Sequence, residues 1–219
     1  MKINFLVVLA TFIATSVNAQ KMTYDAGTTT FGIRAGVNFQ NINGKNANEN
    51  KLNYDLKTGI NAGVNAEIPV GTGSYLQPGV LFSQKGTKFS NTNELRLNYI
   101  EVPINFIYKP VLGSGRMLLG FGPYVGFGLG GKYKYESGPI QNELKVEFEK
   151  EASTYNANVY KGIDGGANFL AGYEFANNQS FQINAQLGLT NVNPTIINSS
   201  NDQTKMKNTG FGISAGYRF

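Results

Sequence analysis

The sequence predicts an all-β fold: an eight-stranded antiparallel up-and-down transmembrane β-barrel with short periplasmic turns and long extracellular loops. Apolar residues alternate with small or polar residues in eight segments, as in the terminal GFGISAGYRF, residues 210–219. The connections between segments alternate between short turns and long polar loops. Charged residues within the segments lie on the face opposite the apolar series, as expected for a barrel lumen.

The first 19 residues have the pattern of a secretory signal peptide. Lys2 precedes an apolar run over residues 3–17, and Val17-Asn18-Ala19 is a small-residue cleavage signature. An uncleaved anchor or an internal strand is the alternative interpretation. We therefore expect a signal peptide at residues 1–19, a short periplasmic segment at 20–29 and a single barrel domain at 30–219.

Eight alternating segments follow the expected signal peptide. In the first of them the apolar residues occupy odd positions, and small or polar residues, including Arg34, occupy even positions. Leu81 and Ile107 interrupt the polar faces of the third and fourth segments, and glycine dominates the polar face of the fifth. The strands are expected at residues 30–40, 60–68, 76–85, 99–108, 117–129, 163–175, 181–189 and 210–219.

The connections fall into two classes that alternate along the chain. Three are short and rich in turn-forming residues, at 71–74, 112–115 and 176–179. Four are longer and polar, at 43–55, 86–94, 131–161 and 191–207. Outer-membrane barrels place short turns in the periplasm and long loops outside the cell.

The distribution of charge separates a membrane barrel from a soluble one. A soluble lipocalin-like barrel has an apolar interior, which here would enclose charges such as Arg34, Glu67, Glu101 and Asp164. An unpaired buried charge costs several kcal/mol. The outward apolar face of a membrane barrel avoids this cost, and eight strands leave a lumen that side chains fill, so we expect no water-filled pore.

Aromatic residues gather near the expected periplasmic ends of the strands, where they would form an interfacial girdle. The alternative is that they are core residues of a β-sandwich, which also has alternating strands. The aromatic residues concerned are Phe31, Tyr108, Tyr173, Phe175, Phe181, Tyr217 and Phe219.

Five sequence features together resemble the PorT-like outer-membrane β-barrel proteins of Gram-negative bacteria. They are YIEVPINF (99–106), GFGPYVGFGLGGK (120–132), GANFLAGYEF (166–175), LGLTNVNP (187–194) and the terminal aromatic residue. The resemblance implies an outer-membrane location. It also implies that Tyr217 and Phe219 form the C-terminal signal read by the barrel-assembly machinery. No motif here carries over the secretion role of the family's name-giving member.

Composition argues against several activities. Without Cys there is no disulfide framework and no thiolate metal site. Without His the usual general base is missing, although a Ser-Lys or paired-carboxylate mechanism stays open. The formal charge of +5 is too small and too scattered to indicate nucleic acid binding. We expect no enzyme activity and no cofactor.

Strand order brings several charged residues to the periplasmic end of the lumen. The first strand adjoins the second and the eighth, so we predict an ionic cluster of Arg34, Glu67 and Arg218, completed across the bore by Glu174. Alternatively, each side chain binds water or a nearby backbone group. The other charges expected in the lumen are Lys85, Glu101 and Asp164.

The loop at residues 131–161 is the strongest candidate for recognition of a partner. KYKYE (132–136) and LKVEFEKE (144–151) alternate like strands, so the wall is expected to extend as a hairpin whose edge binds an extracellular partner. A solvated loop with local strand structure is the simpler alternative. The preferred function is a structural or interaction protein in outer-membrane lipid. The alternatives are a small-molecule transporter or ligand-binding barrel, or a soluble secreted lipocalin-like binder.

Overall fold

The computed structural model describes residues 27–219 except 91, 138–139, 153–155 and 198–203. The expected signal peptide at residues 1–19 therefore lies outside the described residues, as does most of the segment at 20–29. Eight long strands make up most of the described chain. They are β1 (Thr30–Lys45), β2 (Lys57–Gly71), β3 (Ser74–Lys88), β4 (Glu94–Tyr108), β6 (Gly115–Ser137), β11 (Ile163–Glu174), β12 (Gln179–Gly188) and β14 (Lys205–Arg218).

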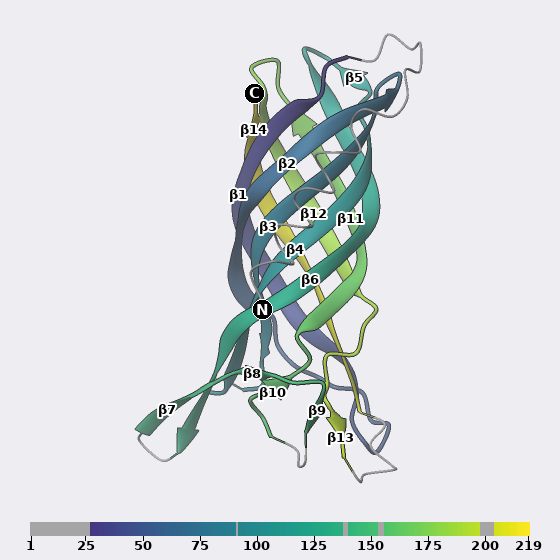
Figure 1. Ribbon diagram of the computed structural model, residues 1–219. Coiled ribbons are helices and arrows are strands. Elements are labelled where there is room, and N and C mark those ends of the chain that lie inside the picture. The colour runs from purple at the N-terminus through teal and green to yellow at the C-terminus, as the bar shows by residue number, and fades with distance from the viewer. Residues whose placement is uncertain (1–26, 91, 138–139, 153–155, 198–203) are drawn as a thin grey trace.

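These strands form one closed ring in which every pairing is antiparallel (Figure 1). The ring order is β1-β2-β3-β4-β6-β11-β12-β14, which follows the order of the chain, and β14 closes the ring against β1. Closure leaves none of the eight strands with an unpaired edge along the main wall. Within the described residues, no helix is long and apolar enough to cross a membrane.

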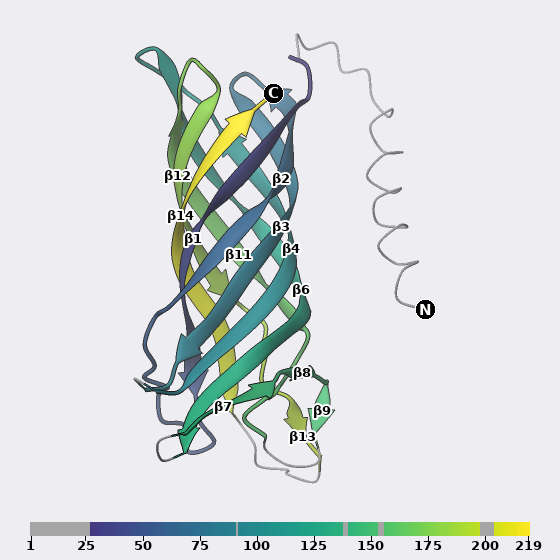
Figure 2. The same ribbon diagram turned by 90° about the vertical axis from the view of Figure 1, so that its left-hand side faces the viewer.

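Six short strands complete the secondary structure of the described residues. β5 extends the turn before β6, and β7 pairs with the far end of β6. Two small parallel pairs, β8 with β10 and β9 with β13, lie at the same end as β7 (Figure 2). The short strands are β5 (Val111–Leu112), β7 (Ile140–Lys145), β8 (Glu147–Phe148), β9 (Glu151–Ala152), β10 (Val159–Tyr160) and β13 (Thr195–Ile196).

The two ends of the ring differ as the connection lengths predict. We call the end with the β2–β3, β5–β6 and β11–β12 turns the turn end, and the opposite end the loop end. Each of these turns contains a residue with positive φ: Gly73 (65°), Gly113 (62°) and Asn178 (65°). Glycine and asparagine adopt this left-handed conformation at the least cost, so the short connections follow from local chemistry.

The predicted apolar faces point outward on all eight strands. Ile60 is 52% exposed, Phe121 58% and Ile183 58%, whereas the polar residues between them lie inside. Leu81 and Ile107, which interrupted the alternation, lie on the inward face and are buried. Ile107 packs there with Leu118 and Leu170 in a small apolar layer on the inner face of β4, β6 and β11.

The strands extend further toward the loop end than the sequence analysis predicted, and there the two faces exchange character. β4 shows the exchange at the register shift between Asn98 and Tyr99. Toward the loop end its inward residues are apolar and its outward residues polar, and toward the turn end the reverse holds. The inward series is Leu95, Leu97, Tyr99, then Glu101 and Asn105; the outward series is Glu94, Arg96, Asn98, then Ile104 and Phe106.

This exchange explains why the predicted strands were too short. The prediction followed the outward apolar series, and it placed residues 43–55, 86–94 and 191–207 in loops. The structure instead continues β1 to Lys45 and β3 to Lys88, starts β4 at Glu94 and starts β14 at Lys205. A wall that leaves an apolar environment keeps its hydrogen bonds but needs polar side chains outside.

Candidate functional site

The lumen is the candidate functional site, because it gathers most of the buried polar side chains. From β1, β2, β3 and β4 come Asn38, Gln40, Asn61, Glu67, Gln77, Ser83, Lys85, Glu101 and Asn105. From the other wall come Asp164, Asn168, Gln182, Asn184, Gln186 and Ser214. Since neighbours on a strand alternate faces, the same residues that expose an apolar wall must enclose a polar lumen.

A mouth cluster of four charged residues occupies the lumen near the turn end. It consists of Glu67, Lys109, Glu174 and Arg218. The Lys109 Nζ lies 2.5 Å from the Glu67 Oε2 and 2.7 Å from the Glu174 Oε2. The Arg218 Nη2 lies 2.6 Å from the Glu67 Oε1, and its Nε 3.4 Å from the Glu174 Oε2. Each carboxylate therefore lies between two cations.

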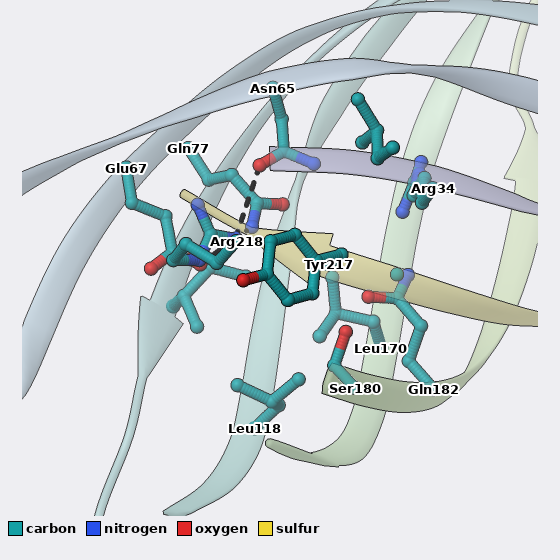
Figure 3. Close-up of a pocket in the computed structure, with 13 residues that line it drawn as sticks. Arg34, Asn65, Glu67, Gln77, Leu118, Leu170, Ser180, Gln182, Tyr217 and Arg218 are labelled. Carbon is teal, nitrogen blue, oxygen red and sulfur yellow. Dashed lines mark hydrogen bonds and ion pairs between the residues drawn. The ribbon is translucent and has the colours of Figure 1, made fainter. Parts of the chain in front are cut away.

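Neutral partners complete the mouth cluster. Gln77 donates a hydrogen bond of 3.0 Å to Glu67, and Arg218 donates one of 3.2 Å to Asn65. Figure 3 shows Arg218 beside Glu67 and Asn65. The Lys109 Nζ also lies 5.3 Å from the centre of the Tyr75 ring. Buried charges are tolerated when they are paired and hydrogen-bonded in this way.

The structure brings together three of the four residues in the predicted cluster. Glu67, Glu174 and Arg218 meet. Arg34 stays apart, as its distance from Glu67 and Arg218 in Figure 3 shows. Among the described residues Arg34 forms no ion pair, and its Nε and Nη1 are buried without a hydrogen-bond partner. Lys109 takes the place of Arg34. Counting alternate positions beyond Ile107 would have placed Lys109 in the lumen, but the predicted strand ended at Tyr108.

A central cluster lies further along the lumen and contains the three other predicted lumen charges. The Lys85 Nζ lies 2.6 Å from the Glu101 Oε1 and 2.8 Å from the Asp164 Oδ2. It also lies 4.2 Å from the centre of the Tyr124 ring, a cation–π contact. Gln186 donates a hydrogen bond of 2.9 Å to Glu101. One buried cation thus holds two buried carboxylates, which come from β4 and β11 on neighbouring parts of the wall.

The charges along the lumen balance. Arg34, Lys85, Lys109 and Arg218 face Glu67, Glu101, Asp164 and Glu174. A net charge in a narrow lumen would repel itself and attract counterions. These eight groups therefore carry no net charge together, although Arg34 has no carboxylate in contact within the described part of the chain. No group of three or more His, Cys, Asp or Glu suited to a metal occurs among the described residues.

A small cavity lies in the lumen between the two clusters. The cavity beside Arg34 and Gln182 has a volume of about 10 Å³, no more than one water molecule needs. A larger cavity of about 490 Å³ opens at the turn end and is lined by residues including Tyr75, Arg116 and Phe219. Lys109, Glu67 and Glu174 also line this vestibule, so the mouth cluster forms its inner boundary.

A second apolar core fills the lumen at the loop end. Its buried members come from β1, β4 and β14, from the short strand β10 and from the connections, and Tyr54, Phe89, Tyr133 and Phe148 pack against it. The buried set is Ile42, Leu52, Leu95, Leu97, Tyr99, Val146, Tyr160, Val192 and Met206. Here the ring resembles a water-soluble barrel, with its apolar side chains inside and its polar ones outside.

The connection between β6 and β11 folds over this core as a cap. Phe148 of β8 lies against Gly128, where an added Cβ would overlap the phenyl ring, and 6.0 Å from the Tyr99 ring. Only glycine leaves room for Phe148 at this height of the wall. The cap therefore closes the loop end, as the mouth cluster closes the turn end.

At the loop end, beyond the outward apolar band, an ion pair also joins β2 to β4 across the intervening β3. The Lys57 Nζ lies 2.8 Å from the Glu94 Oε2. Burial alone would raise the pKa of Glu94, but the hydrogen bond from Lys57 and the charges of Lys57, Arg96 and Lys134 lower it. Glu94 is thus held as a carboxylate among cations.

The two C-terminal aromatic residues lie on the outward face at the turn end. Tyr217 is 42% exposed and Phe219 68%, and their rings make an edge contact with centres 5.2 Å apart. The Phe219 amide donates a hydrogen bond to the Phe31 carbonyl, which fixes the chain end against β1. Both side chains are accessible to another protein. Their role as a signal for the barrel-assembly machinery stays a prediction.

The predicted hairpin is present. KYKYE forms the far end of β6, and it pairs with β7 from Lys132 opposite Lys145 to Ser137 opposite Ile140. The hairpin projects from the wall at the loop end (Figure 1). β7 pairs only with β6 among the described strands, so its other edge is open. LKVEFEKE does not form one strand: it contributes to β7, β8 and β9 in turn.

No curated protein matches the chain. Among solved structures, it is similar to Ail, the attachment invasion locus protein of Yersinia pestis, with 13% identity and a TM-score of 0.42, covering 88% of this chain and 100% of Ail. It is also similar to Neisserial surface protein A, with 10% identity and a TM-score of 0.45, covering 88% and 100% of the two chains.

A third similar structure is the N-terminal β-barrel domain of OprF from Pseudomonas aeruginosa, with 10% identity, a TM-score of 0.39 and coverage of 89% and 100%. The family described as outer membrane protein beta-barrel domain matches residues 18–194, which is most of the chain. The protein therefore belongs to the outer membrane protein β-barrel domain family, and its location is the outer membrane.

Proposed function

We propose that this protein is a closed barrel that anchors surface structure in the outer membrane, as a structural or interaction protein without a conducting pore. The observation that carries the proposal is the filled lumen. Two ionic clusters, the layer of Ile107, Leu118 and Leu170, and the apolar core under the cap follow one another along the lumen. The cavity beside Arg34, at about 10 Å³, is too small for a solute to pass.

In this proposal the eight strands span the membrane as an up-and-down barrel, with the turn end in the periplasm and the loop end outside the cell. The outward apolar faces support the spanning segment, and the polar wall beyond Asn98 supports an extension into water. We further propose export by the signal peptide at residues 1–19. Tyr217 and Phe219 would be read by the barrel-assembly machinery, and a PorT-like membership within the family belongs to the same proposal.

Single-channel recording tests the closed lumen. Purified protein inserted into a planar lipid bilayer is expected to give no steady conductance, because both charged layers and the cap would have to move to open a path. A steady open state would contradict this function and favour a transporter. Phe148→Ala removes the side chain with which the cap packs on Gly128 and leaves the two ionic clusters in place. This variant is therefore expected to give no steady conductance either.

The vestibule gives a second candidate some support. Its volume of about 490 Å³ lies within the range of small-molecule sites, and Lys109, Arg116 and Glu174 provide polar groups in it. Because the mouth cluster closes its inner end, we favour binding over transport as this alternative. A soluble lipocalin-like binder would need an apolar cavity, whereas the polar lumen between the two clusters is nearly full.

For the interaction role we propose the open edge of β7 as the contact surface, with an extended peptide strand as its partner. Five of the six side chains in Ile140–Lys145 are exposed, and the edge offers unpaired backbone groups. Peptides selected from a display library on the intact protein are expected to lose binding when the hairpin is shortened between Tyr135 and Leu144. If the selected peptides bound the intact protein and the shortened variant equally, the open edge of β7 would not be the contact surface.

A further inference from the structure

The outward wall at the loop end carries two rows of cations that lie directly opposite one another on neighbouring strands. The first basic row consists of Lys45, Lys51 and Lys205. Lys45 of β1 lies opposite Lys205 of β14, and its backbone also pairs with that of Lys51 in an isolated β-bridge. In the second basic row, Arg96 of β4 lies opposite Lys132 of β6, and Lys132 lies opposite Lys145 of β7.

Both rows place like charges opposite one another. Residues directly opposite in an antiparallel pair share a face, with Cβ atoms about 4.5–5.5 Å apart, so like charges there repel. In the second row, Glu143 lies 2.6 Å from Lys132 and Glu94 lies 3.8 Å from Arg96. The first row has no ion pair among the described residues. An external anion would remove the remaining repulsion.

Both basic rows lie beyond the loop-end edge of the outward apolar band, on opposite sides of the ring. Lys45 lies three outward positions beyond Phe39, whose ring stacks on Phe211 with centres 5.2 Å apart at the edge of the apolar band. Arg96 lies two outward positions beyond Ile100. The two rows lie on opposite sides of the ring, separated by β2 and β3 in one direction and by β11 and β12 in the other.

We propose that the two basic rows bind the phosphate groups of lipid headgroups at the loop end of the barrel. The inference rests on the membrane placement proposed above. The rows lie two and three outward positions beyond the apolar band, and their long side chains reach back toward the headgroups, where each Lys or Arg near an anionic surface contributes about 1 kcal/mol. Lysine and arginine donate charge-assisted hydrogen bonds to phosphate oxygens. Two rows on opposite sides would hold lipid around the protruding wall.

Native mass spectrometry of the protein in detergent micelles tests this inference, with phosphatidic acid as the probe and phosphatidylcholine as the reference lipid. The unmodified protein is expected to retain phosphatidic acid in preference to phosphatidylcholine. Replacing all three cations of either row by Gln is expected to weaken retention about tenfold or more. Lys150→Gln, at an exposed lysine of the cap between β8 and β9, is the matched control and should retain the lipid.

Equal retention of phosphatidic acid by the row variants and the unmodified protein would overturn the inference. So would displacement of the lipid by an equal concentration of inorganic phosphate, which would show that the rows bind the free ion. Insertion of each variant into phosphatidylcholine vesicles is followed separately by its heat-dependent mobility on gels. A row variant that inserts but keeps its lipid preference therefore refutes lipid binding by the rows while leaving the membrane placement intact.

Discussion

Lys85→Met is expected to destabilise the folded protein by about 3–5 kcal/mol, the usual cost of removing one partner of a buried ion pair. Lys85 is the cation shared by Glu101 and Asp164, at 2.6 Å and 2.8 Å. Without it two buried carboxylates would remain in one cluster, and each would lose its main source of charge compensation. Methionine has a similar length, so the loss of charge dominates the effect. Unfolding by guanidinium in lipid vesicles, followed by circular dichroism, measures it.

Two further variants separate the loss of charge from the loss of volume. Lys88→Met changes an exposed lysine on the same strand and is expected to alter stability by less than about 0.5 kcal/mol. Combining Lys85→Met with Glu101→Gln and Asp164→Asn removes the uncompensated charges and should recover most of the loss. If Lys85→Met and Lys88→Met were equally stable, the central cluster would not hold the lumen together.

The sequence predicted the wall of the ring well, because the wall is determined locally. Period-two alternation places Phe121 and Ile183 on the outward face whatever the rest of the chain does. The turns at Gly73 and Gly113 follow from residues that tolerate positive φ. Chain order then sets the ring order, since consecutive strands joined by short connections pair with each other.

The contents of the lumen could be predicted only in part. Glu67, Glu174 and Arg218 meet because strand order and register bring their strands to the same height. Whether Arg34 or Lys109 joins them depends on the stagger between strands around the ring, which alternation within one strand does not fix. Lys109 also lies just past the outward apolar series, so it was not counted as part of a strand.

The loop end departed furthest from the prediction, for a physical reason. Outward apolar residues predict the strands, whereas beyond Asn98 the apolar residues of β4 point inward. Polar residues such as Arg96 and Lys132 therefore suggested loops, although they belong to continuous strands. The exchange of faces is itself a sequence signal, and in the membrane placement that we propose it marks the place where the wall leaves the lipid.

Ile183→Arg is also expected to cause a large loss of stability. Ile183 lies on β12 within the outward apolar band, and its side chain is 58% exposed. Arginine at such a position costs about 2–4 kcal/mol at the middle of a bilayer, because the guanidinium must leave water. In a soluble protein the same exposed position would tolerate arginine with almost no change. Ile183→Arg is therefore expected to reduce both the stability of the inserted protein and its yield in membranes.

Ile140 provides a matched control, since it is 62% exposed on the β6–β7 hairpin beyond the band. Ile140→Arg makes the same chemical change in a segment that we propose to lie in water. The most direct test of the account compares guanidinium unfolding of the two variants in phospholipid vesicles. We expect Ile183→Arg to lose about 2–4 kcal/mol and Ile140→Arg to match the unmodified protein. Equal stability of the two variants would contradict the placement of the outward apolar face in lipid.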